Sequence, residues 1–226
     1  MPSYNEIDKE LQEDQEFQKE IQNELKPFLD KIIKSPKTDI SLVKDTLEKS
    51  FVKNIKMHEL METIFQANTS SDENATLTQQ IHELFIYLGL VESLANYYVN
   101  ILVMLVVASG RDFHIESMRD TPRINHAMCI EDLEKSYTPL KTKLNFLRTN
   151  GLKLFVSTID SSLRNDIAHF KIRLENGKIL LRNKPVHEVI SPNKKKIVNC
   201  INRTNLLLAF LACELDLVSS EPSKTK

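Results

Sequence analysis

The most constraining feature of this sequence is a long apolar stretch from Leu84 to Ala108, in which Glu92, Asn96 and Asn100 are the polar interruptions. A membrane span would hold these three side chains only at a cost in free energy. The wider segment from Leu77 to about Ser109 therefore predicts one long helix, covered on several sides at the centre of a helical bundle.

Composition limits the class of protein and its partners. The chain has 226 residues and is 41% hydrophobic, which suffices for a packed core and excludes wholesale disorder. Four glycines and no tryptophan are typical of a helix-rich fold. The net charge is −1, so a nucleic-acid-binding surface would have to be a local patch.

The cysteines and the N-terminal segment bear on the cellular compartment. Cys129, Cys200 and Cys213 are widely spaced and odd in number, which predicts reduced thiols in the cytoplasm. Met1 to Leu25 is highly charged and has no apolar core, so it predicts neither a signal peptide nor an anchor. We therefore expect a cytoplasmic protein that makes no membrane contact.

Two helices are predicted ahead of the central one. Apolar residues at near-heptad spacing predict a helix from Ile7 to Lys34, which Pro27 should kink. Ser41 is the expected N-cap of a second helix that reaches about Asn68.

A polar segment, Asn68 to Thr76, is the expected boundary between two parts of the chain. Residues 1–70 would form an N-terminal helical extension, and residues 71–226 a helical domain. The extension could serve packing or the binding of a partner protein.

Further helices are predicted beyond the central one. Arg111 to Ile130 is a connector with several Arg and His residues, which could meet phosphates or simply be solvated. Glu131 to Thr149 predicts an amphipathic helix that Pro139 could split and that Asn150-Gly151 ends. Its expected inward residues are Leu133, Tyr137, Leu140, Leu144 and Leu147.

The last helix is predicted to begin at Ser191-Pro192, because serine caps helices and proline suits the first turn. Lys194, Lys195 and Lys196 would lie in that turn, where backbone N–H groups favour a bound phosphate. These lysines are candidate substrate-binding residues, the alternative being a solvated lysine run.

The stretch from Ser161 to Phe170 carries the residues best suited to chemistry. Arg164 and His169 have four residues between them, beginning with Asn165 and Asp166. The apolar residues recur every three or four positions, which predicts a helix with one buried face and leaves the polar residues off that face. The apolar stripe is Phe155, Ile159, Leu163, Ile167 and Phe170.

A β-hairpin is predicted directly after this helix. Asn176-Gly177 stands between two short β-prone runs, Lys171 to Glu175 and Lys178 to Arg182, and this dipeptide is the strongest short hairpin signal.

An Arg-Asn-x-x-Ala-His element at the end of an apolar helix, followed by such a hairpin, resembles the HEPN superfamily (higher eukaryotes and prokaryotes nucleotide-binding). The motif covers Arg164 to His169, and the wider likeness in helix order extends from about Ile81 to Val218. The resemblance implies an all-α fold: a HEPN-like helical bundle with a small β-hairpin after the motif helix, here with an N-terminal helical extension. It also implies a metal-independent ribonuclease.

The residue types suit phosphodiester transesterification, in which the 2′-hydroxyl of RNA attacks the adjacent phosphorus. Histidine titrates near pH ~6.5 and can accept or donate a proton near neutrality. Arginine stays charged and can grip two phosphate oxygens. We therefore assign Arg164 to phosphate binding and transition-state charge, His169 to proton transfer, and Asn165 to orienting His169 or the phosphate.

Helix geometry constrains this assignment. Positions five apart differ by roughly 140° around an ideal helix, so Arg164 and His169 do not project from one line, whereas Asn165 and His169 do. Arg164 could swing across, the helix could be distorted, or two copies of the motif could meet in a dimer. The HEPN resemblance implies the dimer, with two motifs facing one cleft.

Supporting residues are expected on the central helix. An acidic or polar residue on an earlier helix often faces the motif in HEPN nucleases; Glu92 is the first candidate here, Asn96 the second and Glu83 the third. The alternative for Glu92 is a solvent-facing carboxylate. Asp166 is a further candidate for a supporting role.

Three functions remain open from the sequence. The first is an endoribonuclease that acts as a toxin or antiviral defence effector and is held by an antitoxin or other partner through the N-terminal helices. The second is a non-catalytic HEPN-like module that binds RNA, a nucleotide or a protein, and the third is a helical interaction protein without nucleic acid. No metal-ligand spacing and no Gly-rich phosphate loop occurs, so we expect neither a metal nor a cofactor.

Overall fold

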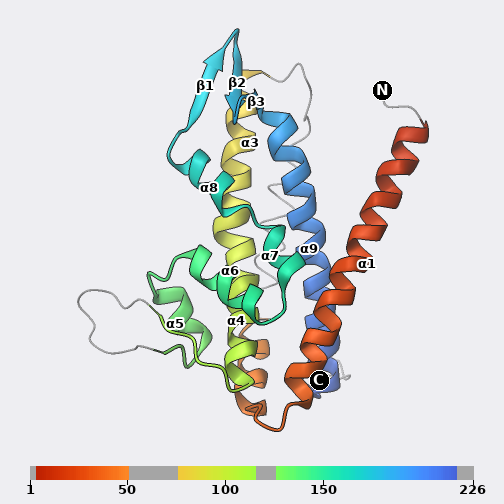
Figure 1. Ribbon diagram of the computed structural model, residues 1–226, viewed down its shortest axis with the longest axis vertical. Helices are drawn as coiled ribbons and strands as arrows, with labels where there is room; N and C mark the ends of the chain where they lie inside the picture. Colours follow the sequence, from red (N-terminus) through yellow and green to blue (C-terminus); the bar gives the residue numbers. More distant parts are fainter. Residues whose placement is uncertain (1–3, 51–75, 116–125, 218–226) are drawn as a thin grey trace, which may run out of the picture.

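A continuous helical rod, residues 77–108, runs through the centre of the structure (Figure 1). The computed structural model describes residues 4–50, 76–115 and 126–217, with side chains from residue 12 onward. The rod consists of α3 (Leu77–Gly89), a π-helical turn η1 (Leu90–Ala95) and α4 (Asn96–Ala108). This confirms the predicted long helix, with one local departure from α-helical geometry inside it.

The rod is a core helix. Every residue of α4 except Asn96 and Val107 is buried, so the helix has no solvent face. By length and composition the rod could cross a membrane, but 78% of its most apolar window is buried inside the structure. Burial by the rest of the chain is the arrangement expected for the central helix of a soluble protein.

The other helices cover the rod on its different sides (Figure 1). Their bounds are α1 (Tyr4–Lys34), α5 (Ile130–Lys135), α6 (Leu140–Thr149), α7 (Lys153–Ser157), α8 (Ser161–Ala168) and α9 (Val186–Glu214). Residues 40–50 form a further helix, whose N-cap is Asp39 and not Ser41 as predicted. The Asp39 side chain accepts a hydrogen bond from the Leu42 N–H at 3.1 Å.

Helix α1 is part of the same hydrophobic core as the rest of the chain. Ile21 and Leu25 are fully buried, and α1 packs on α9 and α7. The Glu24 carboxylate accepts hydrogen bonds from the Leu154 and Phe155 N–H groups at 2.7 Å each, which anchors the start of α7 on α1. The predicted division at residue 70, like the boundary segment before Thr76, lies outside the described residues and stays a prediction.

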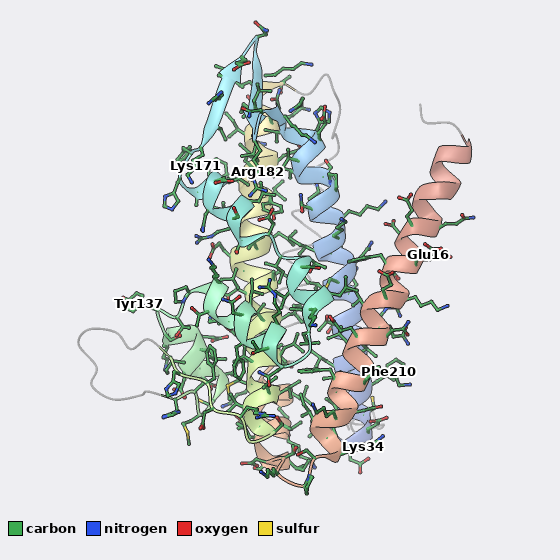
Figure 2. The ribbon with its side chains drawn as sticks, in the orientation of Figure 1. Glu16, Lys34, Tyr137, Lys171, Arg182 and Phe210 are labelled. Atoms are coloured by element: carbon green, nitrogen blue, oxygen red, sulfur yellow. The ribbon has the colours of Figure 1, made fainter. Side chains whose placement is uncertain are left out.

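The predicted helix from Glu131 to Thr149 is split, as Pro139 suggested. Pro139 directly precedes the first turn of α6, where a backbone N–H would have no partner within the helix, so its absence breaks no hydrogen bond. Tyr137, predicted to face inward, lies in the break between α5 and α6 and is 64% exposed; its side chain points away from the molecule in Figure 2. Because the chain is extended there, helical periodicity no longer determines which side it faces.

The predicted hairpin is present, and it carries a third strand that was not predicted. Strands β1 (Ile172–Glu175) and β2 (Lys178–Leu181) pair antiparallel across Asn176-Gly177, both of which have positive φ. A second two-residue turn, Arg182-Asn183, also with positive φ, leads into β3 (Lys184–Pro185). Positive φ at both turn positions is the geometry that matches strand twist.

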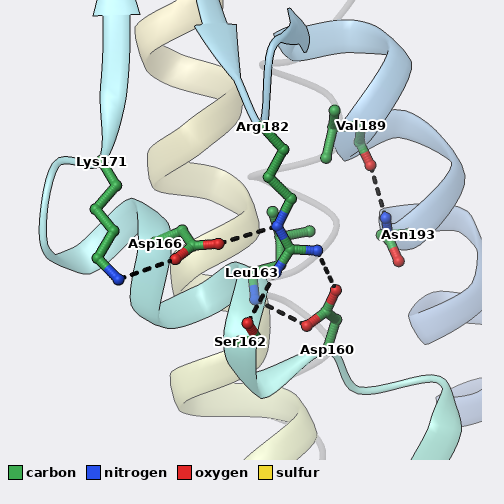
Figure 3. Close-up of polar contacts among 8 residues, drawn as sticks. All are labelled: Asp160, Ser162, Leu163, Asp166, Lys171, Arg182, Val189 and Asn193. Carbon is green, nitrogen blue, oxygen red and sulfur yellow. Dashed lines mark hydrogen bonds and ion pairs between the residues drawn. The ribbon is translucent and has the colours of Figure 1, made fainter.

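The prediction for the start of the last helix is wrong. Helix α9 begins at Val186, and Pro192 lies inside it. The helix continues through Pro192 although proline removes an N–H donor, and in this turn the Asn193 side chain donates a hydrogen bond to the Val189 carbonyl at 2.7 Å (Figure 3). Consequently Lys194, Lys195 and Lys196 do not lie in a first turn, and the argument for a phosphate at a helix N-terminus is lost.

Helix α3 buries some polar side chains and exposes some large apolar ones. Glu83 and Tyr87 are buried at 2% and 0% exposure, whereas Ile81 and Phe85 are exposed at 38% and 58%. Tyr87 Oη makes no hydrogen bond within the described residues. Helix α3 therefore buries polar groups on one side and leaves an apolar stripe uncovered on another.

Two tyrosines on the central rod differ in whether their hydroxyl is bonded. Tyr97 donates to the Ser50 carbonyl, whereas the buried Tyr87 hydroxyl has no partner among the described residues. We expect Tyr97→Phe to lower the free energy of unfolding by about 1–2 kcal/mol, and Tyr87→Phe to leave it unchanged or raise it. Urea titrations of the two variants would measure this, and an equal loss in both would contradict it.

Candidate functional site

The motif lies on α8, a short helix that is separate from the one before it. The Asp160 side chain caps α8 by accepting a hydrogen bond from the Leu163 N–H at 2.8 Å. Leu163 and Ile167 are buried beneath the helix. The predicted single stripe is therefore interrupted between α7 and α8, and Phe170, its last member, is 70% exposed because the chain turns at that residue with φ of 51°.

Arg164 is held between the central rod and its own neighbour. Its Nε donates to a Glu92 carboxylate oxygen in an ion pair, and its Nη1 donates to Asn165 Oδ1 at 2.8 Å. A guanidinium has five N–H donors; these two bonds leave three of them without a partner among the described residues. Arg164 is half-buried, so those donors are held near the surface in a defined orientation.

Glu92 lies in the π-helical turn of the rod. The Asn96 N–H donates to the Val91 carbonyl five residues back, which is the π pattern. An extra residue in a turn shifts the helical phase by about 100°, and such turns are frequent at functional sites. The structure thus brings the first candidate from the central helix to Arg164; its catalytic support role stays a prediction.

His169 ends α8 and is exposed. Its N–H donates to the Asn165 carbonyl at 3.0 Å, and its imidazole makes no hydrogen bond to another described residue. The Asn165 amide oxygen is bonded to Arg164, so in this structure Asn165 orients the guanidinium and not the imidazole. The side chain of His169 is open to a substrate or to another chain.

A buried lysine on α6 contacts the α4 part of the rod, and sequence reasoning missed it. Lys143 on α6 is 3% exposed, and its Nζ donates to Asn100 Oδ1 at 2.9 Å, Asn96 Oδ1 at 3.3 Å and the Leu133 carbonyl at 3.4 Å. Burial lowers the pKa of Lys143 to about 8, against the pull of Glu134 and Glu92. Asn96 is thus engaged by Lys143 and not by the motif.

The burial of Lys143 could have been predicted from its position in the sequence. It lies three residues after Leu140 and four before Leu147, on the apolar stripe of its helix. A lysine at a position that must face the core needs several acceptors around it.

Asp166 faces away from Arg164. Its carboxylate accepts from Arg182 Nε at 2.9 Å and from Lys171 Nζ at 3.3 Å. The bond from Arg182, followed by that from Lys171, holds the pKa of Asp166 below its ordinary value. Asp166 therefore connects α8 to the sheet, which is not the supporting contact predicted for it.

The third candidate on the rod and the lysine run lie elsewhere. Burial raises the pKa of Glu83, which lies near Lys194 on α9. Lys195 pairs with Asp14 at 2.8 Å, and with Lys196 it lines a cavity of about 490 Å³ between α1 and α9. The structure does not bring these residues to the motif.

The described part of the chain contains no group of three or more His, Cys, Asp or Glu residues that could hold a metal ion. Its three cysteines are free thiols. Comparisons with models of protein families, with curated proteins and with solved structures found no match to this chain.

Lys143 gives the stability a defined pH dependence. Its pKa of about 8 in the folded protein lies below the ordinary 10.5, so between these values the unfolded chain keeps a proton that the folded chain has lost. Raising the pH through this window should therefore stabilise the wild type relative to Lys143→Met by about 3 kcal/mol. Denaturant titrations of both proteins from pH 7 to 10.5 would measure this, and a constant difference between them would refute it.

Proposed function

We propose that this protein is a metal-independent endoribonuclease of HEPN type, acting as a homodimer in the cytoplasm. The proposed reaction is transesterification: the 2′-hydroxyl loses its proton and attacks phosphorus, and the 5′-oxygen leaves with a proton. The products are a 2′,3′-cyclic phosphate and a 5′-hydroxyl. One base, one acid and positive charge at the phosphorus are needed.

The observation that carries the proposal is the contrast between Arg164 and His169. Glu92 and Asn165 hold Arg164 in a fixed orientation and leave three of its N–H donors without a described partner. A phosphate could bind these donors with little loss of side-chain entropy. His169 lies exposed at the end of the same helix, and its imidazole makes no hydrogen bond to another described residue. The proposed reaction requires a cation held in a fixed orientation and an imidazole that the substrate can reach.

One histidine per site does not provide both an acid and a base at the same time. Two copies of the chain would provide two imidazoles and two guanidinium groups to one cleft, which also removes the need for Arg164 to reach around α8. A dimer therefore fits the reaction better than a single chain.

An apolar groove beside the motif supports the dimer. Its volume is about 430 Å³, and it lies between α3, the end of α8 and the sheet. Phe85 and Phe170 line it although they are 58% and 70% exposed. Ala168 and Phe170, the two neighbours of His169 in the chain, both line this groove, so a second copy docked here would bring its own motif to the first. Large exposed apolar surfaces of this kind mark interaction sites.

The biological role proposed with this activity is that of a toxin or antiviral defence effector. An antitoxin or other partner would restrain it through the N-terminal helices. Part of α1 offers the required surface, since its exposed face lies along one side of the molecule (Figure 2).

Cleavage of a mixed RNA pool in EDTA tests the activity. The wild type should cut and leave 2′,3′-cyclic phosphate ends, whereas His169→Ala and Arg164→Ala should each lose at least 100-fold in rate, the scale of a lost proton-transfer group. Arg148→Ala, which removes an arginine from α6, should cut normally. Undiminished cleavage by His169→Ala would exclude the assignment; RNA binding without cleavage by any protein would leave the non-catalytic module.

The position of the dimer interface is tested by a charge in the groove. Phe85→Glu should convert the dimer into a monomer in analytical ultracentrifugation and abolish cleavage, because a carboxylate would be buried against apolar side chains. Phe210→Glu is a matched control, since Phe210 is 60% exposed on α9 and lies beside α1, away from the groove (Figure 2). Dimerisation that survives Phe85→Glu would place the interface elsewhere.

A further inference from the structure

Arg182 connects the small sheet to the motif helix through three hydrogen bonds from one guanidinium (Figure 3). Its Nε donates to Asp166 Oδ2 at 2.9 Å, its Nη1 to Asp160 Oδ2 at 2.9 Å, and its Nη2 to Ser162 Oγ at 3.0 Å. Lys171 occupies the other oxygen of Asp166. One side chain from the turn between β2 and β3 thus contacts the N-cap, the first turn and the second turn of α8.

The backbone at Arg182 is itself unusual. Arg182 and Asn183 have φ values of 55° and 62°, in the left-handed region where glycine and asparagine are favoured. An arginine in this conformation costs free energy relative to glycine, and the two-residue turn between β2 and β3 imposes it here. Here the left-handed turn brings the guanidinium over the face of α8 that carries Ser162 and Asp166.

Helix α8 depends on such anchors. It has eight residues, too few for a stable isolated helix, so its position and its rotation about its axis are set by tertiary contacts. Positions two apart differ by about 200° around a helix. Arg164, which pairs with Glu92, therefore projects on the side opposite to Ser162 and Asp166, which bind Arg182.

We propose that Arg182 is a positioning residue for the catalytic motif: with Asp160 and Asp166 it fixes the rotation of α8 so that Asn165 and His169 face outward. Leu163 and Ile167 hold the inner face, and the Glu92 pair holds one side. Arg182 holds the opposite side, and without it α8 can roll on its buried residues. This role rests on the proposed ribonuclease function for its consequence in catalysis, but not for its effect on α8.

The test compares the full-length wild type with Arg182→Met, Arg182→Lys and Lys178→Met. Lys178 lies on the same hairpin and is exposed, so its replacement removes an equal charge without touching α8. Backbone amide hydrogen exchange is measured separately for α8 and α9, and RNA cleavage is measured in EDTA. Arg182→Met should speed exchange in α8 at least tenfold, leave α9 unchanged, and lower kcat at least tenfold.

The two further variants separate positioning from general stability. Arg182→Lys should give intermediate values for α8 exchange and for kcat, because an ammonium lacks the planar fork that reaches three acceptors at once. Lys178→Met should match the wild type. A double variant, Arg182→Met with Asp166→Asn, should lose less than the sum of the losses in the two single variants, since the Arg182–Asp166 contact is removed by both changes.

Unchanged exchange in α8 of Arg182→Met would overturn the proposal, and so would equal acceleration in α8 and α9, which would assign Arg182 to global stability. Faster exchange confined to α8 with an unchanged kcat would overturn its catalytic consequence. A wild type that cuts no RNA would refute the proposed function instead, and the exchange measurements would still decide whether Arg182 sets the position of α8.

Discussion

The pairing of Glu92 with Arg164 is the interaction on which the arrangement of the motif depends. Glu92 lies in the π-helical turn of the rod and is only partly exposed, so an opposite charge beside it is favourable. Arg164 supplies it from α8 while Leu163 and Ile167 are buried beneath. The same contact therefore balances the charge of Glu92 and holds α8 on the rod.

The central rod also explains why several polar side chains of this fold are buried while part of its apolar surface is exposed. Around α4 the rod is covered completely, so its polar residues must find partners in the core; Asn100 does so with Lys143. Around α3 the cover comes from α9, α8 and the sheet, and it is incomplete. Gln80 accepts a hydrogen bond from the Ile179 N–H at 2.7 Å on the covered side, whereas Phe85 is left exposed. The uncovered side is the one proposed to meet a second copy.

The sequence predicted those features that depend on neighbours in the chain. Asn176-Gly177 predicted its hairpin because positive φ at two successive residues is a local property. Pro139 predicted a break because a missing N–H and a fixed φ act locally as well. The same reasoning failed at Pro192, since a proline inside a long helix is tolerated when the helix is held elsewhere, as α9 is by α1 and α3. Local preference is a weak guide where tertiary packing already fixes the backbone.

The sequence by itself determined the central helix, the helical class of the fold and the residues of the motif, because apolar periodicity and the identity of Arg164 and His169 are present in the chain without any contact. Only the tertiary structure decided what each polar residue touches. Glu92, Asn96 and Glu83 were the first, second and third candidates in sequence, and a π turn and the helix that packs opposite each of them decide their actual contacts. Arg182 lies 16 residues from Asp166 and gave no signal of its own, because the contact exists only once the sheet has folded back onto α8. Side-chain pairing between distant elements follows from packing geometry, and a linear pattern does not contain that geometry.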